Sequence, residues 1–292
     1  MKGILLVAGV GSRLYPTTSV LPKALLPVYD KPTIYYPLSD MIAAGITDIL
    51  VICSPTNLHF FKAQLGSGSR FGIDIRYAIQ ASPKGIADAF IVGEKFIGND
   101  DVCLMFGDNV FHGGDFHKIL RNKVAEFNGG AQAFALSVSD PQNFGVVELN
   151  EEGEVVLLEE KPQQPTTDKA VLGLYLCDAG VVDIAKGLTP SARGELEILD
   201  VLKAYQAVGN LAITVFDETL EWIDTGMPDS LLRASEYISE WQPMEMLIGS
   251  PELTAYKQGL ITRERLAEYG DAMRKTNYGD MLTTAAKMKD AR

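Results

Sequence analysis

Short apolar segments alternate with helical patterns along the first half of the chain. Segments rich in branched and aromatic apolar residues predict strands at 3–8, 48–53, 74–79, 101–106 and 132–138. Between them, apolar positions recur at helical spacing over residues 34–44, 57–65, 86–96 and 115–127. This alternation is typical of βαβ units. We therefore expect an α/β fold built on a doubly wound, mixed, mostly parallel sheet.

The pattern changes in the second half. A hairpin at 146–149 and 155–158 and strands at 169–177 and 211–216 predict an extension of the sheet, with helices at 197–208 and 228–241. Beyond Gln242 and Pro243 only short helical patterns follow, at 253–258, 262–269 and 279–287. We expect a core over 1–241, with halves 1–138 and 139–241, and a helical C-terminal appendage over 242–292.

Charge and cysteine content narrow the class of protein. The chain carries 26 Lys and Arg against 38 Asp and Glu, a net charge of −12, and has no basic stripe of the kind that binds nucleic acid. No apolar run reaches the roughly 20 residues that cross a bilayer, and no secretory signal is recognisable, so we expect neither a nucleic-acid nor a membrane partner, and a cytoplasmic location. The three scattered cysteines form no metal motif and are expected to be buried thiols.

A glycine-rich loop follows the first expected strand, where open α/β sheets bind their ligands. Gly9, Gly11 and Ser12 would allow backbone N–H groups to approach phosphate oxygens. A dinucleotide fingerprint would need glycine in place of Leu14 and a helix directly afterwards. The prolines that follow keep the chain in a loop, so a nicotinamide dehydrogenase is a poor interpretation.

Five polar residues near expected strand ends or the glycine loop have both a structural and a functional interpretation. Arg13 and Lys23 are either surface charges or a pair of cations for a triphosphate. Asp108 and Asp224, each after a short apolar segment, are either turn or cap residues or the two carboxylates of a Mg²⁺ site. Gln80 is either a strand-end residue or a reader of the N3–H and O4 edge of thymine or uracil. From the residues alone both interpretations stay open.

A series of motifs along nearly the whole chain favours the functional interpretation of these residues. The chain resembles the sugar-1-phosphate nucleotidyltransferases, and within them the enzymes that use dTTP and glucose 1-phosphate. The resemblance is carried by residues 9–16, 23–32, 35–38, 80–87, 107–109, 144–148, 159–162, 191–198, 222–226 and 277–279.

The resemblance implies a reaction and a set of roles. It implies Mg²⁺-dependent transfer of a nucleotidyl group from dTTP to glucose 1-phosphate, which gives dTDP-glucose and pyrophosphate without a covalent enzyme intermediate. Residues 1–138 would bind the nucleotide and residues 139–241 the sugar. The implied catalytic residues are Arg13, Lys23 and Lys161; the nucleotide-binding residues are Gly9, Gly11, Ser12, Arg13, Gln80 and Gly85; the sugar-binding residues are Gly145, Glu160, Lys161 and Val171; and the metal ligands are Asp108 and Asp224.

The resemblance also bears on assembly and regulation. It implies a homotetramer, and an effector or oligomer region in residues 242–292 that His112 and His117 border. Ala24 replaces the glutamine usual in the family and Leu172 a threonine, which keeps a UTP-using enzyme or one with a different hexose as alternatives. A non-catalytic regulator that binds nucleotide sugars is a further alternative, because a fold by itself does not establish chemistry.

Overall fold

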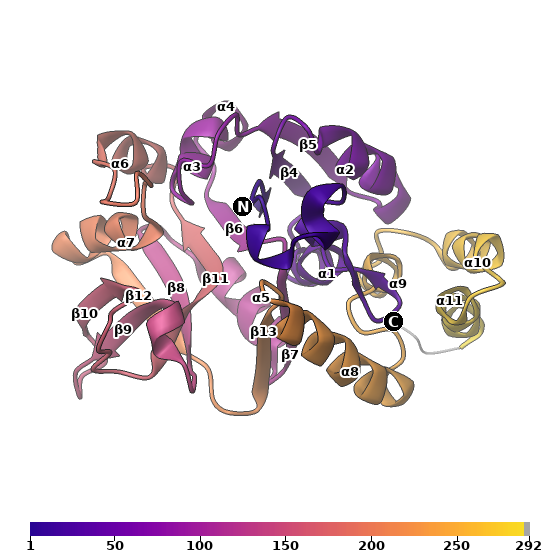
Figure 1. Ribbon diagram of the computed structural model, residues 1–292. Coiled ribbons are helices and arrows are strands. Elements are labelled where there is room, and N and C mark those ends of the chain that lie inside the picture. The colour runs from indigo at the N-terminus through magenta and orange to yellow at the C-terminus, as the bar shows by residue number, and fades with distance from the viewer. Residues whose placement is uncertain (289–292) are drawn as a thin grey trace.

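A nine-stranded sheet forms the centre of the protein (Figure 1), whose computed structural model describes residues 1–288. The early strands pair in parallel: β1 (Lys2–Val7) lies between β4 (Asp48–Cys53) and β6 (Val102–Phe106), with β5 (Asp74–Ile79) outside β4. Each strand starts and ends within a residue or two of its predicted position. Because the four strands run the same way, their carboxyl ends share one edge of the sheet.

The second half of the chain extends this sheet with mostly antiparallel strands, as predicted. The long strand β11 (Lys169–Cys177) pairs antiparallel with β6, β8 (Ala131–Ser137) and β9 (Gly145–Leu149). The hairpin partner β10 (Val155–Glu160) adds to β9, and β12 (Leu211–Val215) adds parallel to β8. β11 thus joins the two halves of the sheet.

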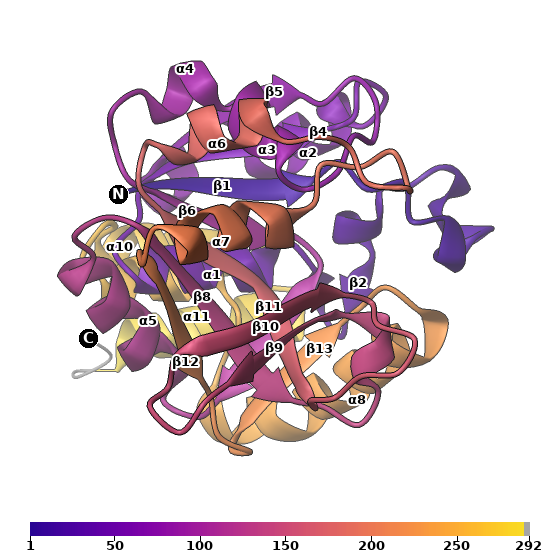
Figure 2. The ribbon, with the colours of Figure 1, turned by 90° about the vertical axis from the view of Figure 1, so that its left-hand side faces the viewer.

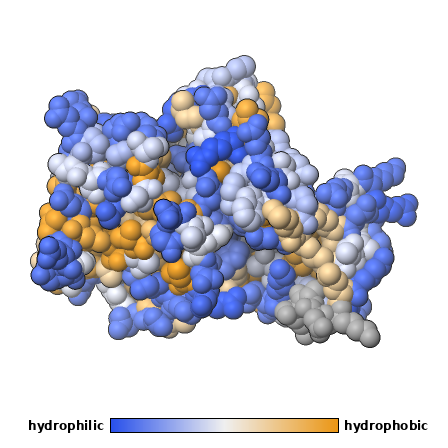
Figure 3. All heavy atoms as spheres, turned by 90° about the horizontal axis from the view of Figure 1, so that it is seen from below, coloured by the Kyte–Doolittle hydropathy of each residue, from blue (hydrophilic) through white to orange (hydrophobic). Residues whose placement is uncertain are grey.

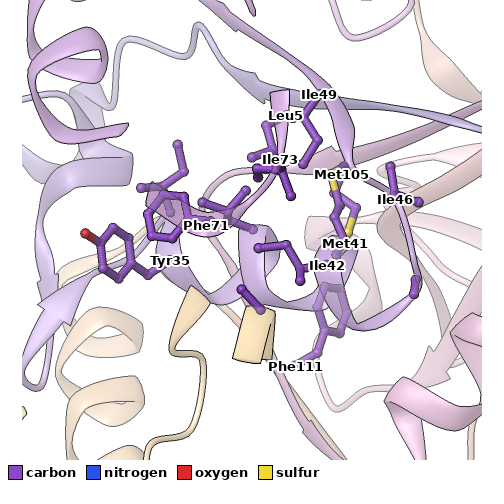
Figure 4. Packing of buried hydrophobic residues seen from close by; sticks show 14 of the residues in the cluster. Leu5, Tyr35, Met41, Ile42, Ile46, Ile49, Phe71, Ile73, Met105 and Phe111 are labelled. Carbon is purple, nitrogen blue, oxygen red and sulfur yellow. The ribbon is translucent and has the colours of Figure 1, made fainter. Parts of the chain in front are cut away.

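Helices cover both faces of the sheet, which confirms the doubly wound architecture. On one face, Leu5, Ile49 and Met105 of three neighbouring strands pack with Met41 and Ile42 of α1 (Figure 4), and all five are fully buried. The other face is covered by α3, α4, α6 and α7, seen beside β1 in Figure 2. The helices of this core are α1 (Tyr35–Ala43), α2 (Leu58–Leu65), α3 (Asp88–Val92), α4 (Glu94–Ile97), α5 (Phe116–Glu126), α6 (Val181–Gly187) and α7 (Ile198–Ala207).

One predicted helix is divided. The helix expected over 86–96 is broken at Gly93 into α3 and α4. Glycine is a poor helix former, and a side chain here would meet the Ala89 carbonyl and Ile4, each 3.0 Å from an ideal Cβ. The bend therefore allows the helix to pack closely on β1.

Two short sheets were not predicted from the sequence. β7 (Asn109–Gly113) pairs with β13 (Leu220–Asp224), and β2 (Pro27–Val28) pairs with β3 (Lys31–Pro32). β2 and β3 have two residues each, which is too few to show a pattern. β7 and β13 form a separate sheet that joins segments far apart in the sequence, and no local pattern predicts that pairing. The first of these sheets matters for the site, because it brings Asp224 beside Asn109.

The C-terminal helices lie at one side of the molecule (Figure 1). α8 (Pro228–Glu245) runs past its predicted end at Trp241 and includes Pro243. The amide of Gln242 anchors this turn, because it donates to Asp30 at 2.7 Å and accepts from Lys31 at 2.8 Å. α9 (Pro251–Lys257), α10 (Arg263–Ala272) and α11 (Asn277–Lys287) follow.

The expected appendage over 242–292 therefore begins inside α8, and its residues 289–292 lie outside the described part of the chain. None of the helices within residues 1–288 combines the length and apolarity of a membrane-crossing segment.

Candidate active site

The glycine loop lies at the carboxyl end of β1 and packs on the segment that carries Lys23. Gly11 has a φ of +67°, in the left-handed region that glycine adopts readily, and caps the short turn Ser12–Leu14. An ideal Cβ at Gly11 would lie 3.2 Å from Cβ of Lys23 and from Cγ2 of Thr18. Gly11 therefore sets the spacing between Arg13 and Lys23. Gly9 has no atom within 4 Å of an ideal Cβ, so the loop is open at that point.

Lys23 lies between two carboxylates from distant parts of the chain. Its ammonium group forms a close ion pair with Asp108 and lies 3.4 Å from Oδ1 of Asp224. Asp108 follows β6 directly, and Asp224 ends β13, whose pairing with β7 sets Asp224 opposite Asn109. Thr225 reinforces the junction, because its backbone N–H and its hydroxyl donate to the Asp108 carbonyl at 3.0 and 2.8 Å.

The electrostatics of this cluster reflect its burial. Burial and the neighbouring Asp108 raise the pKa of Asp224, although Lys23 and Arg13 act in the opposite direction. Burial lowers the pKa of Lys23, but the two carboxylates outweigh burial, so this pKa lies above its ordinary value. Two adjacent carboxylates in one buried place thus require positive charge nearby.

These carboxylates suit a Mg²⁺ ion that also binds phosphate. Within residues 1–288 no group of three or more His, Cys, Asp or Glu side chains could hold a metal ion alone. Mg²⁺ commonly takes one or two carboxylates from the protein and completes its shell with water and substrate phosphates. Asp108 and Asp224 match that donor set.

A cavity of about 390 Å³ opens beside this cluster. Arg13 and Asp224 line it on one side, and Lys161 lines it from the end of the β9–β10 hairpin. The remaining predicted sugar-binding residues also line this cavity: Gly145, Glu160 and Val171. The structure therefore brings Arg13 and the expected sugar-binding residues to one cleft. Lys23, Asp108 and the loop residues Gly9, Gly11 and Ser12 are not among the residues that line it.

Glu160 and Lys161 are held at the end of β10. Burial raises the pKa of Glu160, although the Arg193 guanidinium, which donates to Glu160 at 3.1 Å, opposes this effect. Lys161 has a φ of +47°, which is uncommon for a residue with a side chain, and its N–H donates to the Phe144 carbonyl at 3.0 Å. Such a conformation persists where the surroundings impose it, and it is frequent at functional sites.

Gln80 and Gly85 lie at the same sheet edge but do not line the cavity. The Gln80 amide nitrogen contacts the Gly85 carbonyl at 3.2 Å and the Asp88 carboxylate at 2.9 Å. Both donors are therefore used inside the protein, and the Gln80 carbonyl oxygen is the group left to meet a base. At Gly85, whose φ is +99°, an ideal Cβ would lie 2.4 Å from the Leu196 carbonyl. The absence of a side chain at Gly85 therefore allows the backbone of Leu196 to pack against it.

Two features of the cavity were not predicted from the sequence. Arg193 was part of a recognised motif, but its contact with Glu160 joins segments 33 residues apart. The Trp222 indole N–H donates to Asn109 at 2.8 Å, and the Trp222 ring packs on Phe144 with ring centroids 4.9 Å apart. The place of Trp222 two residues before Asp224 predicts that it lies near the sugar, and Trp222 lines the cavity; its partners Asn109 and Phe144 were not predicted.

A second cavity, of about 500 Å³, lies between α5, β7 and α9. His112 and His117 both line it. The structure thus places both histidines beside the start of the appendage, where the effector region was expected. An effector role for this cavity stays a prediction.

Comparison with known proteins identifies the class. Residues 2–240 match the sequence model of the family described as nucleotidyl transferase, and the chain belongs to that family.

Curated relatives and solved structures make the likeness more specific. The chain is 49% identical over 288 residues to a glucose-1-phosphate thymidylyltransferase of Neisseria meningitidis, which covers 98% of this chain and 100% of that protein. It is 45% identical to the protein of the same name from Mycolicibacterium smegmatis, over 97% of this chain and 98% of that one. A Bacillus anthracis structure described by that name, solved with sucrose, has a TM-score of 0.75 at 38% identity, over 81% of this chain and 94% of that chain. A UDP-glucose pyrophosphorylase with UDP-glucose, at a TM-score of 0.71 and 22% identity over 82% of this chain and 98% of that chain, shares the fold.

Proposed function

We propose that this protein is a glucose-1-phosphate thymidylyltransferase. It transfers a thymidylyl group from dTTP to glucose 1-phosphate and releases pyrophosphate. The observation that carries the proposal is the single cavity lined by Arg13, Lys161 and Asp224, because two phosphorylated substrates repel each other unless cations lie between them. Near-full-length relatives of that name support the choice of substrates.

The reaction needs positioning and charge neutralisation more than proton transfer. A phosphate oxygen of glucose 1-phosphate attacks the α-phosphorus of dTTP, a new P–O bond forms, and the bond to the β-phosphate breaks as pyrophosphate leaves. The nucleophile is already an anion. Lys161 holds it, Arg13 and Lys23 neutralise the triphosphate, and Glu160, Gly145 and Val171 orient the sugar.

Asp108 and Asp224 would hold Mg²⁺. When bound, the ion would offset the charge of the triphosphate. The raised pKa of Asp224, caused by burial and by Asp108, supports this assignment, because such a pair gains most from a cation.

Base recognition rests on the nucleotide loop and on Gln80. Gly9, Gly11 and Ser12 supply backbone and hydroxyl contacts to the phosphates, and the carbonyl oxygen of Gln80 accepts N3–H of the base beside Gly85. Thymine and uracil share N3–H, which keeps UTP as an alternative substrate. Ala24 stands where glutamine is usual and offers no amide to the nucleotide, which also keeps this alternative open.

A matrix of nucleoside triphosphates against hexose 1-phosphates tests the proposal by pyrophosphate release, with and without Mg²⁺. We expect the highest rate with dTTP and glucose 1-phosphate, and no release in excess chelator. A higher rate with UTP or another hexose would move the protein to the alternative enzymes. Binding of nucleotide sugars without turnover of any pair would make it a regulator.

The expected homotetramer is part of the same proposal. Apolar surface on this protein supports self-association, since large apolar patches often mark contacts. Figure 3 shows hydrophobic atoms gathered at the left of the face seen from below. Sedimentation equilibrium tests the expected mass.

A further inference from the structure

Lys23 occupies the place that a metal ion would need. Its ammonium group is in close contact with Asp108 and 3.4 Å from Asp224. The side chain of Lys23 is 13% exposed, against 24% and 29% for the two carboxylates. In the free protein, the positive charge between the two carboxylates is therefore supplied by the chain itself.

Other charged groups lie close to this ammonium group. An ideal Cβ at Gly226 would lie 3.0 Å from Nζ of Lys23, and 2.9 Å from both the Arg13 guanidinium and Oδ1 of Asp224. A Mg²⁺ ion needs oxygen ligands at about 2.0–2.1 Å. A metal ion on Oδ2 of Asp108 and Oδ1 of Asp224 would compete with the Lys23 ammonium group for the same oxygens, and the two cations would repel each other there.

The backbone of Lys23 is fixed, but its side chain has room to change partner. Residues Lys23–Leu25 form a short turn, in which the Leu26 N–H donates to the Lys23 carbonyl at 3.0 Å. The side chain has four rotatable bonds, and its ammonium group and the guanidinium of Arg13 both lie within 3.0 Å of an ideal Cβ at Gly226. Arg13 itself lines the cavity. A triphosphate bound there would offer the ammonium group a new anionic partner.

We propose that Lys23 is a built-in counter-ion that competes with the divalent metal for Asp108 and Asp224, and that transfer of its ammonium group to the triphosphate frees the metal site. This inference rests on the proposed function. It makes the metal bind weakly to the free protein and tightly once nucleotide is present. The coupling is reciprocal, so the metal also strengthens nucleotide binding.

Titration of the nucleotide-free protein with Mn²⁺ alone, followed by electron paramagnetic resonance of the free ion, tests the competition. Lys23→Met keeps the length of the side chain and removes its charge, and we expect its Mn²⁺ dissociation constant to fall about tenfold or more. Lys23→Arg keeps the charge and should bind Mn²⁺ as weakly as the unaltered protein. Lys95→Met is the matched control, because Lys95 is exposed on α4.

Asp108→Asn and Asp224→Asn separate this inference from the assignment of the metal site. Both variants should lose Mn²⁺ binding. Unchanged binding in both would overturn the site itself. Loss of binding in both, without a gain in Lys23→Met, would leave the site in place and overturn the competition.

A second measurement uses the unaltered protein and does not depend on the folding of a variant. Crystals soaked in Mn²⁺ alone would show by anomalous scattering where the ion binds. We expect the Lys23 ammonium group to have left the carboxylates in every copy that holds the ion between them. An ion on Asp108 and Asp224 with Lys23 still in place would contradict the proposal.

Discussion

Two clusters of charged side chains in this protein show how differently acidic and basic residues are used. The cleft cluster comprises Arg13, Lys23, Asp108 and Asp224, and the junction cluster comprises Arg70, Glu252, Tyr35, Tyr278 and Ser250. In the junction cluster the fully buried Glu252 accepts from Arg70 Nε at 3.0 Å, from the Tyr278 hydroxyl at 2.6 Å and from Ser250 at 3.4 Å.

The junction cluster ties the C-terminal helices to the core. Glu252 and Tyr278 come from α9 and α11, whereas Arg70 precedes β5, and Arg70 also donates to the Tyr35 hydroxyl of α1. Every charge there is met within the protein. This cluster also borders a cavity, of about 230 Å³, lined by Arg70, Tyr35 and Tyr278, but its carboxylate is fully buried and paired. In the cleft cluster, the charged side chain of Arg13 lies at the wall of the larger cavity, of about 390 Å³. The contrast teaches that a closed set of ionic contacts stabilises the fold, whereas an open set is ready for a ligand.

The largest expected effect is on stability, at the junction. Glu252→Gln should lower the free energy of unfolding by about 3 kcal/mol, since breaking a buried ion pair leaves the partner uncompensated, and Arg70, at 34% exposure, is only partly rescued by water. Denaturant unfolding measures this change. The control Glu268→Gln removes an exposed pair with Arg265 and should cost at most about 1 kcal/mol. A hundredfold loss of turnover in Glu252→Gln at unchanged stability would break the comparison.

The next largest effect is expected on turnover, when the positive charge of Arg13 at the cavity wall is removed. Arg13→Ala should reduce turnover by about 10²-fold or more, as for other preorganised charge-stabilising groups, while the melting temperature stays close to that of the unaltered protein. Steady-state pyrophosphate release and a thermal melt measure the two quantities. Arg265→Ala, at an exposed ion pair on α10, serves as the control for loss of an arginine. Full turnover in Arg13→Ala would remove Arg13 from the mechanism.

A smaller effect on kcat/KM is expected when recognition of the nucleotide base by Gln80 is removed. Gln80→Met removes the free acceptor of the amide together with its hydrogen bonds to Gly85 and Asp88. Loss of the hydrogen bond to the base should lower kcat/KM for dTTP about tenfold without changing KM for glucose 1-phosphate. The exposed Gln142→Met is the control. An equal loss for both substrates would mean that Gln80 acts through the fold, by way of Asp88, and does not read the base.

The smallest expected effect concerns the three cysteines, which we expect not to react with a thiol reagent in the folded protein. Burial raises the pKa of Cys53 to about 11 and also raises the pKa of Cys103 and Cys177. The folded protein should therefore fail to react with a thiol reagent at pH 8. The denatured chain should react at all three cysteines, with three equivalents of reagent consumed per chain. Rapid labelling of any cysteine in the folded protein would show that the core opens more easily than its packing implies.

The sequence was most informative where local pattern and packing agree. The apolar segments at 48–53 and 169–177 became β4 and β11 with the predicted bounds, because each is buried along almost its whole length. The position of Asp108 after β6 followed from the same pattern. Carboxyl-end positions are predictable because parallel strands place them at one edge.

Long-range pairing could not be predicted in the same way. The contact of Lys23 with Asp224 spans 201 residues, and that of Arg70 with Glu252 spans 182. No local sequence pattern predicts contacts between residues so far apart along the chain. The sheet of β7 and β13 sets the first contact, and it pairs two segments that lie far apart in the sequence. α8 continues through Pro243 because Gln242 is held by Asp30 and Lys31, a tertiary effect that outweighs helix propensity.

The most direct test of the account is a crystal structure of the protein with dTDP-glucose. We predict the diphosphate between Arg13 and Lys161, and the glucose against Glu160 and Val171 in the 390 Å³ cavity. Product bound only in the cavity lined by His112 and His117, with the cleft empty, would contradict the claim that the cleft is where the two phosphorylated substrates meet.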